Sequence, residues 1–286
     1  RMILKSINAW SFPGGLEGTL TPEDAIAKAV KYGFEDVELT IAGDGPLGLD
    51  ADEARCTEIR NVAERAGLPL RSVASGVYWG RSLGSPDAAE REGALDDLRR
   101  LVKIAGWLGA KTLLTIPGAV DVFFAPDRPV HPYDEVLKNA ADGLKAVLPE
   151  AEKAGVRMGI ENVWNRFLLS PTEMAGFIDG FDSPFVGSYL DVANVLPFGY
   201  PEQWLRILGP RVVGIHFKDF RRAVGTAEGF VDLLEGDVNW PELMAAIESV
   251  GYDGPVVAEM IPLYKHHPEV RVANTSRAMD AILGRD

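Results

Sequence analysis

The sequence contains few of the side chains on which catalytic and metal sites are most often built: its 286 residues include one cysteine and four histidines. The single Cys56 cannot form an internal disulfide, and one cysteine is too few for zinc-finger spacing. The chain is long enough to bury a large apolar core without such links. We therefore expect a protein of a reducing compartment, and we assign it to the cytoplasm.

Long hydrophobic runs and an excess of basic residues are also absent. No stretch approaches the roughly 18 apolar residues needed to cross a bilayer, and the N-terminal segment lacks the basic and apolar regions of an export signal. The 29 Lys and Arg are outnumbered by 42 Asp and Glu, which gives a formal net charge of −13. Because nucleic-acid binding depends largely on Lys and Arg that neutralise phosphates, we expect neither a membrane nor a nucleic acid as partner.

Short apolar runs alternate with longer amphipathic stretches along the whole chain, and this alternation predicts eight strand–helix pairs. Expected helix starts carry a capping residue and a proline, as at Thr21-Pro22 and Ser170-Pro171, and expected helix ends are followed by glycine. The strands are expected at residues 3–7, 36–41, 70–74, 112–116, 157–161, 186–191, 212–216 and 256–259. Further helices are expected at residues 51–66, 86–108, 133–154, 201–208 and 241–250.

Eight alternating units in a chain of this length predict an α/β fold, specifically a (β/α)8 TIM barrel, whose typical size is about 250 residues. The competing doubly wound open sheet would carry a glycine-rich nucleotide-binding turn, and no GxGxxG or Walker A pattern occurs. No linker interrupts the alternation, so residues 1–286 are expected to form one domain. The long irregular segments 42–50, 117–132 and 218–239 all follow strands, which predicts that they wall the active site.

Four successive predicted strands end in ionisable side chains, namely Glu161, Asp191, His216 and Glu259. In a barrel these strand ends meet at one mouth. Three carboxylates and one imidazole suit Mn²⁺ best, with Mg²⁺ or Co²⁺ as alternatives. A single strand-terminal carboxylate is about as often a helix cap or an ion-pair partner, but three clustered carboxylates would repel one another without a cation. The set of four therefore predicts one divalent metal ion.

A metal held in this way suggests chemistry on a ketose. The ion can chelate the C2 carbonyl and the C3 hydroxyl, acidify the C3 hydrogen and stabilise the resulting enediolate. One glutamate removes the proton, and the other returns a proton to the opposite face if it lies across the plane, which inverts the carbon. Removal of a C1 proton and return of a proton to C2 would give aldose–ketose isomerisation instead, and residue spacing does not distinguish these outcomes.

An ordered set of short motifs covers residues 159–259. The motifs are Ile160-Glu161-Asn162 with Asn165-Arg166-Phe167, Leu190-Asp191-Val192-Ala193-Asn194, His216-Phe217-Lys218-Asp219, Gly236-Asp237-Val238-Asn239-Trp240 and Gly254-Pro255-Val256-Val257-Ala258-Glu259-Met260. In this order they resemble the xylose-isomerase-like barrel superfamily of sugar and sugar-phosphate isomerases and epimerases, nearest to its ketose 3-epimerases of the D-tagatose/D-psicose and L-ribulose-5-phosphate type. The resemblance extends over essentially the whole chain.

The resemblance implies that Glu161, Asp191, His216 and Glu259 bind the metal and that the two glutamates also transfer protons. It further implies that Arg222 binds the O1 end of the substrate, with the adjacent Arg221 as the alternative. Two departures from the free-sugar epimerases leave the substrate and its phosphorylation open. Asn194 stands where those enzymes have histidine, as in many sugar-phosphate members, and Leu168 stands where they have a substrate-binding glutamate.

Other residues are candidates for substrate contact. Trp10, Trp79 and Trp164 follow predicted strands and would ring the mouth, where aromatic faces commonly wall sugar pockets, although packing beneath loops accounts for them equally well. Lys218 follows His216 by two residues and would point the same way, toward a substrate oxygen or phosphate; a salt bridge to Asp219 or another acid is the alternative. The roles of the loop histidines, His266 and His267, stay open.

The leading prediction is thus a cytoplasmic, metal-dependent sugar or sugar-phosphate isomerase or epimerase, with 3-epimerisation of a ketose as the leading reaction. Barrels of this family commonly self-associate, so a homo-oligomer, either a dimer or a tetramer, is expected. A keto-sugar or inosose lyase or dehydratase would use the same metal site. An endonuclease-IV-like DNA-repair enzyme is a weaker alternative, because the site of that enzyme resembles a histidine-rich cluster of three metals. A degenerate sugar-binding barrel is disfavoured by the presence of all four candidate ligands.

Overall fold

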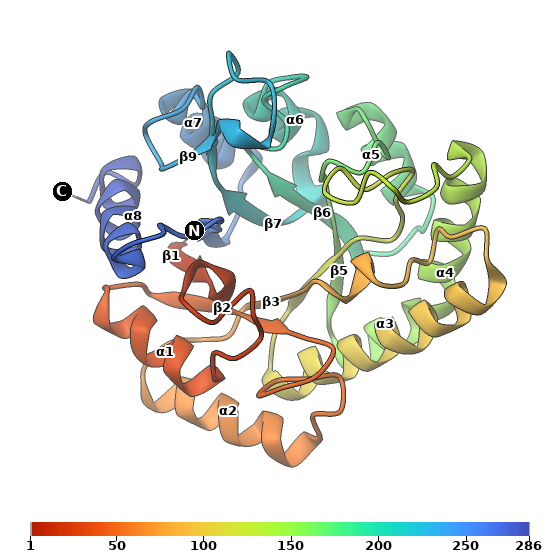
Figure 1. Ribbon diagram of the computed structural model, residues 1–286, viewed down its shortest axis with the longest axis horizontal. Coiled ribbons are helices and arrows are strands. Elements are labelled where there is room, and N and C mark those ends of the chain that lie inside the picture. The colour runs from red at the N-terminus through yellow and green to blue at the C-terminus, as the bar shows by residue number, and fades with distance from the viewer. Residues whose placement is uncertain (1, 286) are drawn as a thin grey trace.

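Eight parallel strands close into a barrel with eight helices around it in a computed structural model that describes residues 2–285 (Figure 1). The barrel strands are β1 (Ile3–Asn8), β2 (Asp36–Ile41), β3 (Ser72–Ser75), β4 (Thr112–Thr115), β5 (Arg157–Glu161), β6 (Val186–Asp191), β7 (Val212–Phe217) and β10 (Gly254–Ala258). The barrel closes where Ile3 of β1 pairs in register with Gly254 of β10. The prediction of a (β/α)8 barrel is confirmed.

The helices form the outer ring. They are α1 (Pro22–Lys31), α2 (Glu53–Arg65), α3 (Ala88–Leu108), α4 (Tyr133–Ala154), α5 (Pro171–Asp179), α6 (Pro201–Leu208), α7 (Trp240–Val250) and α8 (Pro268–Ile282). The expected capping residues act as caps: the Thr21 hydroxyl accepts the Asp24 N–H, and the Ser170 hydroxyl accepts the Glu173 N–H. Gly109 and Gly155 end their helices at φ of 83° and 67°, a backbone region that favours glycine.

Most boundaries agree with the sequence prediction to within two residues. Among the strands, the predicted and observed bounds differ most at β3, which was expected at 70–74, and at the last strand, β10. Strand β10 ends at Ala258, so Glu259 directly follows it. Two two-residue strands, β8 (Asp219–Phe220) and β9 (Phe230–Val231), pair in antiparallel fashion inside the segment 218–239 and were not anticipated. No helix among residues 2–285 combines the length and hydropathy needed to span a membrane.

Two layers of side chains hold the barrel together. Apolar side chains between the strands and the helix ring form the core; Leu101 and Ile104 of α3 are fully buried there. Inside the barrel several polar side chains are also fully buried, including Asn8, Glu38 and His216. Because charged groups are rarely buried without partners, this polar interior marks the part of the barrel that serves the site.

Candidate metal centre

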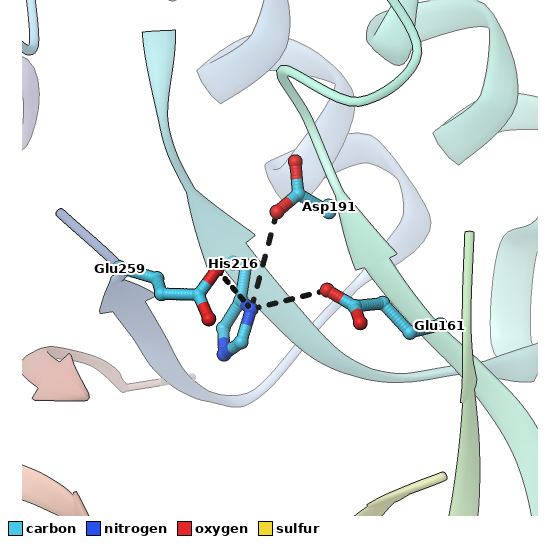
Figure 2. A group of neighbouring side chains, drawn as sticks. All are labelled: Glu161, Asp191, His216 and Glu259. Atoms are coloured by element: carbon cyan, nitrogen blue, oxygen red, sulfur yellow. Dashed lines mark ion pairs between the residues drawn. The ribbon is translucent and has the colours of Figure 1, made fainter. Parts of the chain in front are cut away.

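Four side chains from four neighbouring strands converge at the carboxyl end of the barrel. Glu161 ends β5, Asp191 ends β6, His216 lies in β7, and Glu259 follows β10, in the same order as these strands stand in the sheet. Figure 2 shows the three carboxylates around Nδ1 of the imidazole. The Nδ1 atom lies 3.4 Å from Glu161 Oε1, 3.7 Å from Glu259 Oε2 and 4.0 Å from Asp191 Oδ2. One ligand atom from each residue falls within 4.8 Å of every other, and all four residues are buried.

The strand register explains this convergence. Asp191 pairs directly with His216, so the two side chains stand side by side on the inner face of the barrel. Tyr189 pairs with Glu161, and Val257 pairs with His216. Side chains two residues apart along a strand point to the same face, so Glu259, two residues after Val257, also points inward and lies nearer the mouth than Val257.

The hydrogen bonding of the cluster is incomplete in a way that suits a cation. Among the described residues, five buried side-chain polar atoms make no hydrogen bond, and three of them are His216 Nδ1, Asp191 Oδ2 and Glu259 Oε2. Apart from His216 itself, the two carboxylate oxygens have only the Lys218 ammonium as an ion-pair partner among the described residues, and Nδ1 faces carboxylate oxygens. Three buried carboxylates therefore share one lysine and have room for a further cation. One imidazole nitrogen and carboxylate oxygens are a donor set that fits Mn²⁺ or Mg²⁺.

Lys218 partly neutralises the cluster. Its ammonium lies 3.0 Å from Asp191 Oδ2 and also contacts Glu259 Oε2. Burial lowers the pKa of Lys218, but these carboxylates outweigh that effect and hold the pKa above its ordinary value. The predicted alternative of a salt bridge from Lys218 to an acid other than Asp219 is therefore confirmed. Asp219 instead accepts the N–H groups of Phe220, Leu234 and Val238, and so organises the loop after β7.

Burial and charge also shift the pKa values of Glu161 and His216 in the metal-free cluster. Burial raises the pKa of Glu161 to about 7, although the neighbouring His216 opposes the shift. Burial lowers the pKa of His216, but the carboxylates of Glu38 and Glu259 outweigh it and hold that pKa well above its usual value. Without a cation, both groups therefore retain protons to higher pH than they would in water.

An asparagine that the sequence analysis did not single out fixes the backbone around the cluster. Asn162 accepts the Asp191 N–H at 2.9 Å and donates to the Asp191 carbonyl at 2.8 Å. The other Asp191 carboxylate oxygen, Oδ1, accepts the N–H groups of Ala193 and Asn194, which leaves Oδ2 directed at the cluster. Asn194 donates its amide to the Asn162 carbonyl and lines the adjacent pocket.

A cavity of about 510 Å³ opens beside Glu161 and Glu259. The predicted residues Trp10, Trp79, Trp164, Asn194 and Lys218 all line it, together with three aromatic residues that the sequence analysis missed, Phe123, Phe124 and Phe230. Trp79 packs edge-on against Phe124 at 5.1 Å between ring centroids. The segments 117–132 and 218–239 therefore wall the cavity as expected, whereas the segment 42–50 lines a neighbouring hollow.

Arg222 is the proposed substrate residue that the structure does not bring to this cavity. Its guanidinium donates to the Gly199 carbonyl at 2.9 Å and lies over the Tyr200 ring. The adjacent Arg221 donates to the Glu235 carbonyl. His266 and His267 are exposed and lie outside the cavity lining.

Comparison with known proteins gives one matching family model, named relatives and solved structures of the same fold. A family model described as "Xylose isomerase-like TIM barrel" matches residues 26–281. L-ribulose-5-phosphate 3-epimerase UlaE of Escherichia coli is 23% identical over 261 residues, which cover 91% of this chain and 87% of the relative. A solved D-psicose 3-epimerase with D-tagatose, from Clostridium cellulolyticum, has a TM-score of 0.78 at 18% identity and covers 99% of this chain and 97% of its own.

A second solved structure, 3-keto-D-glucoside 4-epimerase from E. coli, has a TM-score of 0.76 at 16% identity and covers 99% of this chain and 98% of its own. At such identities the structural likeness shows a shared fold and leaves the substrate undetermined.

Proposed function

The chain belongs to the xylose isomerase-like TIM barrel family, and from this premise we propose that it is a divalent-metal-dependent ketose 3-epimerase. It is an enzyme of the isomerase class, as its named relatives are. Sugar epimerisation agrees with the names of the relatives, and the reaction at C3 and the metal requirement are our proposal.

One observation carries the proposal: two glutamates face the same cavity from opposite sides of the candidate metal centre. Glu161 is the last residue of β5 and Glu259 directly follows β10, and β6 and β7 lie between these two strands in the barrel. Figure 2 shows their carboxyl groups on either side of His216 Nδ1. A substrate centred over the cluster would present opposite faces of one carbon to two different carboxylates, which is what inversion by two bases requires.

A divalent cation held by Glu161, Asp191, His216 and Glu259 would polarise a ketose carbonyl and stabilise the negative charge that develops on adjacent oxygens. Within that frame, one glutamate removes the C3 proton and the other delivers a proton to the opposite face. Lys218, which contacts Asp191 and lines the cavity, is placed to donate a hydrogen bond to a substrate oxygen. The aromatic side chains that line the cavity would keep water from the reacting carbon and so strengthen the electrostatic interactions there.

Hydrogen exchange in D₂O tests the reaction class. The Mn²⁺-loaded protein is incubated with free ketohexoses and ketopentoses and with L-ribulose 5-phosphate, and the products are followed by NMR. We expect deuterium at C3 together with the C3 epimer. An aldose product with deuterium at C2, or recovered ketose with deuterium at C1, would indicate an isomerase, and loss of water from the substrate would indicate a dehydratase; either result would replace the proposal.

Matched variants test the assignment of the two bases. Glu161→Gln and Glu259→Gln should each lower turnover by about 10²- to 10⁴-fold, the usual contribution of a general acid or base. Glu64→Gln, which changes an exposed glutamate of α2, is the control and should leave turnover unchanged. Full activity of either cluster variant would overturn the proton-transfer assignment.

A further inference from the structure

Glu38 of β2 reaches the candidate metal centre from the far side of the barrel. We propose that Glu38 is a positioning residue: its carboxylate accepts the Nε2–H of His216 and thereby leaves the Nδ1 lone pair free for the cation. The inference rests on the metal site of the proposed function and assigns a role to a residue outside the ligand set.

The carboxylate of Glu38 is fully buried and surrounded by donors. Its Oε1 atom accepts Asn8 Nδ2 at 2.7 Å and lies 2.8 Å from His216 Nε2. Its Oε2 atom accepts the Ser72 hydroxyl at 2.6 Å and also the Tyr189 hydroxyl. A carboxylate has about four acceptor positions, so these four partners saturate it.

The chemistry of these partners decides the tautomer of His216. An ionised carboxylate only accepts hydrogen bonds, so the nitrogen that faces it must carry a proton. Neutral imidazole has one N–H, and placing that proton on Nε2 leaves Nδ1 as the unprotonated nitrogen. This Nδ1 atom faces the carboxylates of Glu161, Asp191 and Glu259 and makes no hydrogen bond.

The same network fixes the orientation of the ring. The Tyr189 ring packs edge-on against the His216 imidazole, with centroids 4.7 Å apart, while its hydroxyl is held by Glu38. Rotation of the imidazole would break its contact with Glu38 and its edge-on packing with this ring. A carboxylate behind a ligating histidine also makes the imidazole a better electron donor to a metal.

A purely structural role for Glu38 has a matched comparison on the same strand. Asp36, two residues earlier, is also fully buried; it accepts the Ser6 hydroxyl at 2.6 Å and does not belong to the cluster. If buried carboxylates of β2 serve only stability, Glu38→Gln and Asp36→Asn should behave alike toward metal.

Mn²⁺ titration followed by electron paramagnetic resonance separates the two roles. Circular dichroism first establishes a temperature at which the unmodified protein and both variants are folded. Glu38→Gln should weaken Mn²⁺ binding by about 10- to 100-fold, as loss of a partner behind a metal ligand typically does. Asp36→Asn should leave the dissociation constant unchanged.

A second measurement needs no variant. Nitrogen-15 NMR of the histidine-labelled protein loaded with Mg²⁺ reads the proton position on His216 directly. We expect the proton on Nε2. A proton on Nδ1, or unchanged Mn²⁺ affinity of Glu38→Gln, would overturn the positioning role while leaving the metal site intact. If the unmodified protein binds no Mn²⁺, the metal site of the proposed function fails and the inference fails with it.

Discussion

Gly214 of β7 supplies a test of the packing beneath the candidate metal centre. A Cβ atom at this position would lie 2.6 Å from both Cδ2 and Cε2 of Tyr189 and 2.9 Å from its Cζ. Non-bonded carbon atoms pack at about 3.5–4.0 Å, so in Gly214→Ala the ring must move by about 1 Å. Tyr189 is among the largest fully buried side chains of the protein, so the movement meets close-packed neighbours.

The expected cost has two parts. Overpacking of a buried site costs about 1–3 kcal/mol. Displacement of the Tyr189 ring also strains the hydrogen bond from its hydroxyl to Glu38, and a buried group left unpaired costs about 1–3 kcal/mol. Gly214→Ala should therefore lower the free energy of unfolding by about 2–6 kcal/mol. It should also weaken Mn²⁺ binding, because Tyr189 packs against the His216 ring.

Urea unfolding measures the stability change, and Gly176→Ala is the matched control. Gly176 lies in α5, and a Cβ there would meet nothing within 4 Å. That control should gain about 0.5–1 kcal/mol, because alanine is the better residue inside a helix. If Gly214→Ala unfolds at the same urea concentration as the unmodified protein, the ring of Tyr189 is not packed as described and the reasoning fails.

Three further predictions concern charge. Lys218→Met should strengthen Mn²⁺ binding, because it removes a cation that contacts two of the candidate ligands, and weaker Mn²⁺ binding would contradict this. The same variant should lower kcat/KM by about 10- to 100-fold, because the charged hydrogen bond to the substrate is lost. Burial raises the pKa of Asp36 from 3.8 to about 7, so its stabilising contribution is complete below the unfolded pKa and lost as the pH rises through about 7. Urea unfolding should show that the unmodified protein loses up to roughly 4 kcal/mol relative to Asp36→Asn between about pH 4 and about pH 8, and parallel pH profiles would exclude this. Mn²⁺ binding near pH 7 should release about one or two protons, because the pKa values of Glu161 and His216 are raised in the metal-free cluster. Calorimetry in buffers of different ionisation enthalpy measures this release, and binding enthalpies that do not depend on the buffer would refute it.

The fold and the convergence of four side chains could be predicted because both depend on local signals and topology. Helix caps such as Thr21 and Ser170 act within one turn, and apolar runs mark the strands, so most boundaries were placed within two residues. Once eight parallel strand–helix units are recognised, barrel closure places the carboxyl ends of all strands at the same rim. The proximity of Glu161, Asp191, His216 and Glu259 therefore required no knowledge of side-chain rotamers.

Contacts across the barrel and the directions of loop side chains could not be predicted in the same way. Glu38 lies in β2 and His216 in β7, and 178 positions separate them, so no spacing rule connects the two. A usable signal was present: Asp36 and Glu38 alternate with apolar residues in a strand that a closed barrel buries on both faces. The resemblance implied that Arg222 contacts the substrate, but the loop directs its guanidinium to the Gly199 carbonyl.

Buried charge explains why one imidazole suffices in a site so poor in histidine. The carboxylates of Glu38, Glu161, Asp191 and Glu259 are buried against two cationic or titratable partners, Lys218 and His216. With a neutral imidazole the group carries three net negative charges, which a divalent cation reduces to one. Isolated buried charge is costly, so without metal the cluster lowers its charge by retaining protons, as the raised pKa values of Glu161 and His216 show. Because Glu38 can only accept hydrogen bonds, it keeps a proton on Nε2, and the proton that must leave when the cation binds is the one on Nδ1.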